Sequence, residues 1–110
     1  MANTFKLFTE DGSSVGATTD MTIYTVPSST TTICIGLTLA NLTTGSITAD
    51  VKIVNADGDN VFIGKNLPIP TGSSLSALAG KIVLNTGDVL KIQSDTANSI
   101  DTALSIMEQT

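Results

Sequence analysis

Histidine, arginine and tryptophan are absent from this sequence of 110 residues, and each absence excludes a kind of chemistry. Without histidine, a serine or threonine lacks its usual activating base, and the commonest metal ligand is missing. With no tryptophan and one tyrosine, the chain lacks the exposed aromatic platform that binds sugars. These gaps count against an enzyme. They also disfavour a carbohydrate-binding module, which we keep as an alternative because β-sandwiches often serve that role.

Basic charge is scarce and scattered. Five lysines stand against ten acidic residues, which gives a net charge of −5. The lysines are dispersed along the chain, at Lys6, Lys52, Lys65, Lys81 and Lys91. A protein that binds nucleic acid needs a basic patch, and an anionic membrane surface attracts clustered cations. We therefore expect no nucleic acid and no membrane among the partners.

The only cysteine, Cys34, lies in the apolar run Ile33–Leu37. A single thiol forms no internal disulfide, and this one has neither a base nor a second thiol ligand to make it reactive. We interpret Cys34 as a small buried core residue.

Polar clusters in the sequence are better explained as turns than as sites. The segment Asn55–Asn60 alternates carboxylates as calcium loops do, but its twelfth position is Asn66, where such a loop needs a glutamate. The sequon Asn41–Thr43 marks glycosylation only in a secreted protein. Three further carboxylates stand next to Gly, Thr or Ser, as turn residues commonly do: Asp88, Asp95 and Asp101. The sequence predicts no catalytic residue, no cofactor and no metal site.

Segments for export or membrane insertion are not apparent. The N-terminal residues Met1–Lys6 show no charged region followed by an apolar core, so we expect no signal peptide. The most apolar stretch, Ile33–Leu42, is too short for a bilayer and contains Gly, Thr and Asn. We expect a protein made and folded in a cytoplasm.

Hydrophobic residues recur with a period of two, which is typical of strands with one buried face. One apolar row is Ile33, Ile35, Leu37 and Leu39, and the next is Ile47, Ala49, Val51 and Ile53. Two adjacent segments with this alternation predict an antiparallel pair. We expect Ile35, Leu37, Val51 and Ile53 to be buried in one core.

Turn signals recur about every ten residues and divide the chain into eight or so short strands. The turns are expected at Asp11-Gly12, Pro27-Ser28, Asn41–Gly45, Asp57-Gly58, Pro70–Gly72, Thr86–Asp88 and Asp95–Ser99. Ser73–Gly80 also fits a short helix, but the close spacing of its neighbours favours a strand over Leu75–Leu78. The pattern predicts an all-β fold with one domain over residues 1–110, an antiparallel β-sandwich of the jelly-roll or Ig-like type.

Apolar residues also fall on the nominally outward faces of these strands, at Val54, Val83, Val89 and Met107. Exposed apolar patches usually mark interfaces, so we expect self-association. Terminal strands lie most often at sheet edges. We therefore expect the interface to involve the segment Met1–Glu10 or the last strand, Ile100–Met107.

A family resemblance extends over roughly residues 22–108. Its motifs are Tyr24–Ser28, an Ile/Leu strand ending in Ala40-Asn41, Val51–Ile53, Pro68–Leu75, Gly80–Leu84, Gly87–Ile92 and Ser105–Glu108. In these turn and strand signatures the chain resembles small β-sandwich virion proteins of tailed bacteriophages. The short segment before Tyr24 lies outside the matched region and is either an arm that reaches a neighbour or a first strand.

The resemblance implies a non-enzymatic structural protein with no catalytic residues to carry over. Some such proteins decorate or cement the capsid, and others belong to the neck or tail. Our first expectation is a capsid decoration or cement protein that binds the major capsid lattice as a homo-oligomer in the virion. The resemblance favours a trimer, because a threefold ring suits the local threefold positions of an icosahedral shell. A neck or tail component is the alternative.

Overall fold

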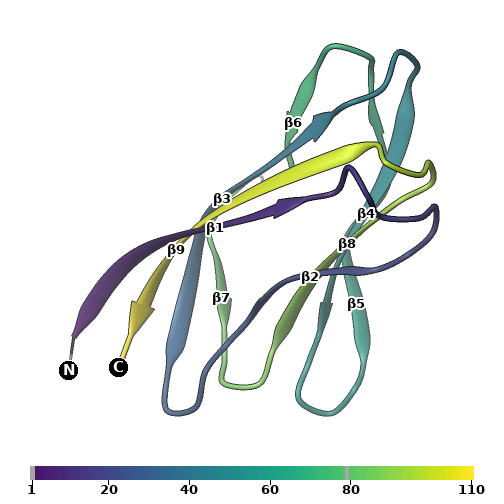
Figure 1. Ribbon diagram of the computed structural model, residues 1–110. Helices are drawn as coiled ribbons and strands as arrows, with labels where there is room; N and C mark the ends of the chain where they lie inside the picture. Colours follow the sequence, from purple (N-terminus) through teal and green to yellow (C-terminus); the bar gives the residue numbers. More distant parts are fainter. Residues whose placement is uncertain (1, 79) are drawn as a thin grey trace.

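Nine β-strands and no helix make up the part of the chain that the computed structural model describes, residues 2–78 and 80–110 (Figure 1). The strands are β1 (Asn3–Asp11), β2 (Met21–Thr25), β3 (Thr31–Asn41), β4 (Ile47–Val54), β5 (Asn60–Ile69), β6 (Ser74–Ser76), β7 (Ile82–Leu84), β8 (Val89–Ser94) and β9 (Ile100–Gln109). Within those residues, no helix could cross a membrane. The predicted all-β class is confirmed.

The strands form two antiparallel sheets. One has five strands in the order β1-β9-β3-β6, with β7 also paired to β3, and the other has four in the order β2-β8-β4-β5. If β6 and β7 are counted as one interrupted strand, there are eight strands, and successive strands lie in different sheets except for the β4–β5 hairpin, which is the order of a jelly roll. The β-sandwich prediction is therefore confirmed, and the strand order favours the jelly roll over the Ig-like alternative.

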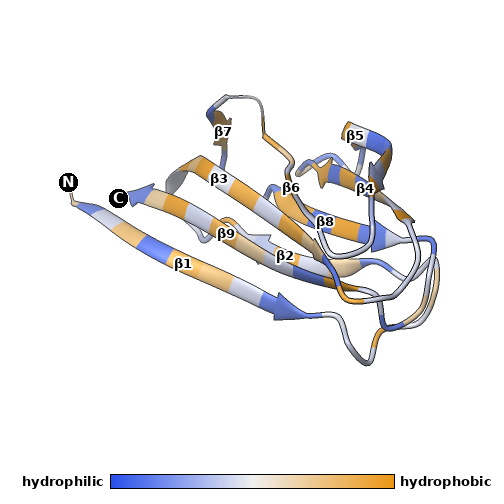
Figure 2. Ribbon diagram, turned by 90° about the horizontal axis from the view of Figure 1, so that it is seen from above, coloured by the Kyte–Doolittle hydropathy of each residue, from blue (hydrophilic) through white to orange (hydrophobic). Residues whose placement is uncertain are grey.

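The core lies between the two sheets and is built from alternate residues of the long strands. Ile47, Ala49 and Val51 of β4 point inward, as the period-two pattern predicted. From the five-stranded sheet, Leu104 and Ile106 of β9 meet them. The hydropathy colours alternate along β9 and β3 in Figure 2 for this reason.

Turn chemistry places the strand ends where the sequence predicted them. The Asp57-Gly58 turn closes the β4–β5 hairpin with Gly58 at a φ of 89°, a left-handed conformation that suits glycine. Strand β6 ends at Ser76, so it is shorter than the predicted strand Leu75–Leu78. The short helix considered for Ser73–Gly80 is not formed in its described residues, and Ala79 lies outside them.

One part of the core prediction is wrong. Leu37 and Val51 are buried and Ile53 is partly buried against the core, but the side chain of Ile35 is 42% exposed. A β-bulge between Cys34 and Gly36 in the β3–β9 pairing shifts the alternation by one residue. As a result Cys34 points inward in the first half of β3, and Leu37 does so in the second half.

The expected edge position of the last strand is also wrong. Strand β9 lies between β1 and β3, in the middle of the five-stranded sheet. Strand β1 is the edge strand, as expected for the N-terminal segment, of which Met1 lies outside the described residues. Figure 1 shows the two chain ends side by side, where Ala2 and Thr110 exchange backbone hydrogen bonds of 3.0 Å.

Candidate interaction surface

The edge strand β1 is the most exposed long strand of the molecule. Its outward-pointing side chains include Phe5, which is 73% exposed, and Leu7, which is 64% exposed. Figure 2 shows β1 along the margin of the molecule, with β9 as its one neighbour in the sheet. A long exposed strand with large apolar side chains is a ready surface for another protein.

An apolar row crosses the outer side of the five-stranded sheet. Phe5 of β1 lies opposite Met107 of β9, Met107 lies opposite Ile33 of β3, and Ile33 lies opposite Val83 of β7. Leu7 stands beside Phe5 on β1, and the bulge turns Ile35 outward beside Ile33. We call this surface the apolar face, and its six residues are Phe5, Leu7, Ile33, Ile35, Val83 and Met107.

The outer side of the four-stranded sheet is covered by charge. Phe62 is its large exposed aromatic residue, and the ammonium of Lys65 lies 4.4 Å from its ring centroid. Lys65 also pairs with Asp50 at 3.2 Å, and Lys52 pairs with Asp20 at 2.8 Å. Ion pairs and cation–π contacts therefore lie over this side, where Phe62 remains 44% exposed. Among residues 2–78 and 80–110, no ion pair or cation–π contact involves the six residues of the apolar face.

A buried polar network fixes β1 to both sheets. Glu108 of β9 is buried, and its carboxylate accepts a hydrogen bond of 2.5 Å from the hydroxyl of Tyr24 on β2. The other carboxylate oxygen pairs with Lys6 of β1 at 2.7 Å. Because Tyr24 donates to Glu108, its oxygen accepts from the hydroxyl of Thr32 at 2.8 Å.

These contacts shift the acid–base equilibria of the network. The Lys6 ammonium, and after it the Tyr24 hydroxyl, lowers the pKa of Glu108 below its ordinary value because both bind the charged form. Burial, helped by the bond to Glu108, raises the pKa of Tyr24 to about 12. Glu108 is therefore ionised and Tyr24 neutral near pH 7, which is the state that holds β1 in place.

The corner after β1 closes against β9. A Cβ atom placed on Gly12 would lie 1.8 Å from the backbone oxygen of Ile100, so only glycine fits there. The backbone N–H of Gly12 donates to the carboxylate of Asp101 at 3.2 Å. This explains the Asp11-Gly12 turn, and it gives Asp101 a structural role.

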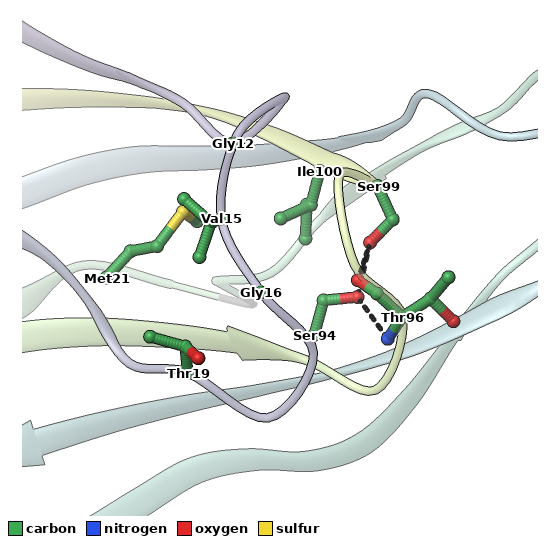
Figure 3. Close-up of a pocket in the computed structure, with 9 residues that line it drawn as sticks. All are labelled: Gly12, Val15, Gly16, Thr19, Met21, Ser94, Thr96, Ser99 and Ile100. Atoms are coloured by element: carbon green, nitrogen blue, oxygen red, sulfur yellow. Dashed lines mark hydrogen bonds between the residues drawn. The ribbon is translucent and has the colours of Figure 1, made fainter.

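A small pocket lies beside this corner (Figure 3). It has no space for a water molecule, and its polar groups are already paired. Ser99 donates to the carbonyl of Thr96 at 2.6 Å, and the hydroxyls of Ser94 and Ser99 bond at 2.5 Å. With no base beside these hydroxyls, the pocket offers no nucleophile.

A second, open hollow of about 370 Å³ lies on the outer side of the five-stranded sheet, at the far end from Phe5 and Val83. Its lining includes the carboxyl residues Glu10, Asp11 and Asp101. Among residues 2–78 and 80–110, no three acidic or thiol side chains converge to hold a metal ion. The hollow is an acidic end to a surface that is apolar at its other end.

Several of the polar residues singled out in the sequence have structural partners. In the Asp57 turn, the side chain of Asn55 accepts from the N–H groups of Asp57 and Asp59 at 3.0 Å each. The amide of Asn41 donates to the carbonyls of Gly45 and Ile69, at 2.8 and 2.9 Å. These two bonds give the buried amide of Asn41 a structural role that does not involve glycosylation.

The remaining carboxylates and the thiol also serve the fold. The carboxylate of Asp88 accepts from the N–H of Asn85, and that of Asp95 accepts from the N–H of Thr48. Cys34 is 2% exposed, and burial raises its pKa to about 11, so it is a core thiol.

Two of the four apolar residues that the sequence places on outward strand faces belong to the apolar face. Val83 is 58% exposed and Met107 is half-buried, and both belong to the apolar face. Val54 and Val89 lie opposite each other on β4 and β8 and are half-buried. The sequence interpretation missed Phe5 and Leu7 as surface residues, although their alternation with Lys6 was the signal that could have found them.

Comparison with known proteins gives a fold relationship and no family. No family model matches the chain, and no curated protein matches it. A solved structure of a Bacillus endospore appendage, from a family of disulfide-linked pili, is 15% identical with a TM-score of 0.54, over 97% of this chain and 84% of that one. A chain of infectious bursal disease virus Gt strain is 12% identical with a TM-score of 0.26, over 97% of this chain and 41% of that one, and supports no inference. The first similarity shows a shared fold.

Proposed function

We propose that this chain is a non-enzymatic structural protein of a tailed-bacteriophage virion, which decorates or cements the capsid by binding the major capsid lattice as a homo-oligomer. The observation that carries the proposal is the apolar face, because interface centres are poor in charge and a free monomer gains nothing from exposing such residues. The resemblance over residues 22–108 supports the phage setting. The threefold number rests on that resemblance alone.

A filament subunit is the second candidate, because a pilus-forming chain shares the fold. Those pili are disulfide-linked, whereas the one cysteine of this chain is buried in the core. A filament built from this protein would therefore have to be held by non-covalent contacts. A neck or tail position in the virion would use the same apolar face, and the experiment below separates it from the capsid.

The test is co-sedimentation of the purified protein with capsids and with tails of its own virus, with two matched variants. Val83→Lys places a charge on the apolar face, and Val61→Lys places one on β5, where the valine is 50% exposed. We expect Val83→Lys to weaken capsid binding by about tenfold or more, since it desolvates a charge at the interface, and Val61→Lys to leave it unchanged.

Three results would contradict the proposal or parts of it. Equal binding by both variants would exclude the apolar face as the contact. Binding to tails alone would move the protein to the tail. A protein that binds neither capsids nor tails and is absent from purified virions would end the phage proposal.

A further inference from the structure

Five strands form the edges of the two sheets, and β1 differs from the other four. Strand β2 has five residues and a bulge, β5 contains Pro68 and two register shifts, and β6 and β7 have three residues each. Short strands, bulges and proline are the usual means by which edges avoid pairing with other chains. Strand β1 pairs over nine residues without a register shift and has none of these features.

The hydrogen-bonding groups of β1 can be assigned to one side or the other. Ala2 and Thr110 exchange both of their backbone bonds at 3.0 Å, and antiparallel strands alternate bonded and non-bonded pairs from such a point. The even-numbered residues of β1 therefore bond to β9. The odd-numbered residues direct their N–H and C=O groups away from the sheet: Asn3, Phe5, Leu7, Thr9 and Asp11.

Two charged residues of β1, Lys6 and Glu10, lie at inward positions and are the candidates to guard this edge. The ammonium of Lys6 is already paired with Glu108 at 2.7 Å, and Glu10 lies near the end of the strand, opposite the buried Thr102. A second strand arriving at the edge would therefore meet a neutralised ion pair. The backbone of β1 remains available over its whole length.

We propose that β1 pairs antiparallel with β1 of a second copy, about a twofold axis at Leu7, so that two five-stranded sheets become one continuous sheet. This inference rests on the proposed function and deepens it by naming the contact through which the protein self-associates. It replaces the threefold number, which rests on the resemblance alone, with a twofold pair. In this register Leu7 lies opposite its counterpart, and all five outward-directed residues find partners. The two apolar faces become adjacent.

Side-chain chemistry selects this register over its neighbours. A shift by two residues in one direction sets Lys6 opposite Lys6, where like charges repel. A shift in the other direction sets Phe5 opposite Asp11. With Leu7 at the axis, Thr4 lies opposite Glu10, and the Glu10 carboxylate comes within diagonal reach of Lys6 in the other copy. Charge complementarity therefore favours a second copy as the occupant of the edge.

The oligomeric state is the first measurement. Light scattering of the full chain at increasing concentration is expected to approach twice the mass of 11.3 kDa. Thr9→Pro removes an outward N–H without touching a bond to β9, and is expected to weaken dimerisation by about tenfold or more, since twofold symmetry removes two bonds. Thr9→Val keeps the N–H and is the matched control.

Cross-linking tests the register. Leu7→Cys brings two thiols to the twofold axis within disulfide reach, so oxidation is expected to give a covalent dimer. Phe5 is even more exposed than Leu7, but it lies opposite Thr9 of the other copy, so Phe5→Cys is expected not to cross-link. Buried Cys34 is present in both variants and serves as an internal control.

Each outcome has a defined meaning. A monomer, a trimer, or equal cross-linking of both cysteine variants would overturn the pairing. A monomer that still binds capsids would refute this inference and the homo-oligomer, and would leave capsid decoration in place. A dimer with the predicted cross-link that binds no virion component would support the β1 pairing and refute the proposed function.

Discussion

The outer sides of the two sheets carry opposite kinds of surface on similar backbones. On the four-stranded sheet, Phe62 is covered by Lys65, and Lys52 is paired with Asp20. On the five-stranded sheet, Phe5 and Val83 are 73% and 58% exposed. Both sheets bury the middle of their inner sides against each other, so the need for a core does not explain the difference.

The few lysines of this chain are placed unevenly over the two sheets. Lys52 and Lys65 lie over Phe62, and Lys6 points inward to Glu108. Within residues 2–78 and 80–110, no lysine forms an ion pair or a cation–π contact with the six-residue apolar face. A surface that is left apolar while its counterpart is covered is the one expected to meet a partner.

The largest expected effect comes from displacing the strand that carries Phe5 and Leu7. Gly12→Ala places a methyl group 1.8 Å from the backbone oxygen of Ile100, so the corner between β1 and β9 must move. We expect a loss of about 3 kcal/mol in the free energy of unfolding, measured by urea denaturation. Gly45→Ala is the control, because its Cβ would meet nothing within 4 Å. Equal stability of the two variants would contradict this account of the corner.

Tyr24→Phe tests how the apolar face is tied to the other sheet. The substitution removes the hydroxyl that donates to Glu108 and accepts from Thr32. We expect a loss of about 2 kcal/mol, because a buried carboxylate loses a charge-assisted bond. Hydrogen exchange of the β1 amides should rise at the same time. Unchanged protection of β1 would show that Glu108 and Lys6 hold the strand without Tyr24.

The pH dependence should differ at the two extremes. Tyr24 and Cys34 have folded-state pKa values raised to about 12 and about 11, so their stabilisation is complete below their ordinary values of 10.0 and 9.0 and is lost as pH rises through the folded values. The pKa of Glu108 is lowered, so its contribution is lost as pH falls below 4.5.

Urea denaturation between pH 3 and 11 would measure both effects. Tyr24→Phe should reduce the alkaline loss, and Cys34→Ala should reduce it further. A curve that is flat from pH 9 to 11 would argue against burial of both groups.

The smallest effect is expected from removing the cation over Phe62, so that the outer side of the four-stranded sheet also exposes an uncovered apolar side chain. Lys65→Ala uncovers Phe62 and removes the partner of Asp50, at a cost of about 0.5 kcal/mol, since exposed ion pairs contribute little. Concentration-dependent light scattering should nevertheless increase. Lys81→Ala removes the same charge elsewhere on the surface and controls for net charge. Equal scattering by both variants would mean that the cover over Phe62 does not limit association.

The sequence predicted the fold class because its signals are local. Alternation along Ile47–Val51 and the Asp57-Gly58 turn need only neighbouring residues, and the structure contains both. The exposure of Ile35 was not predictable in this way, because the bulge depends on how β3 pairs with β9. The central place of β9 likewise depends on strand order, which no single segment encodes.

The surface was partly predictable for the same reason. Val83 and Met107 were identified from alternation within their own strands. The row that joins them to Phe5 depends on cross-strand register between segments far apart in the chain. Local patterns can therefore suggest that an interface exists, but they do not show its shape.

The central position of β9 has a consequence for biosynthesis. Both β1 and β3 use β9 as their neighbour, so the five-stranded sheet cannot assemble until β9 has been synthesised and has left the ribosome. The four-stranded sheet needs nothing beyond Ser94 and can pair earlier. Until β9 emerges, the nascent chain holds β1 and β3 without their shared neighbour, and the long-range contacts that slow folding are still to be made. The pairing proposed for β1 is thereby delayed until β9 has joined the sheet.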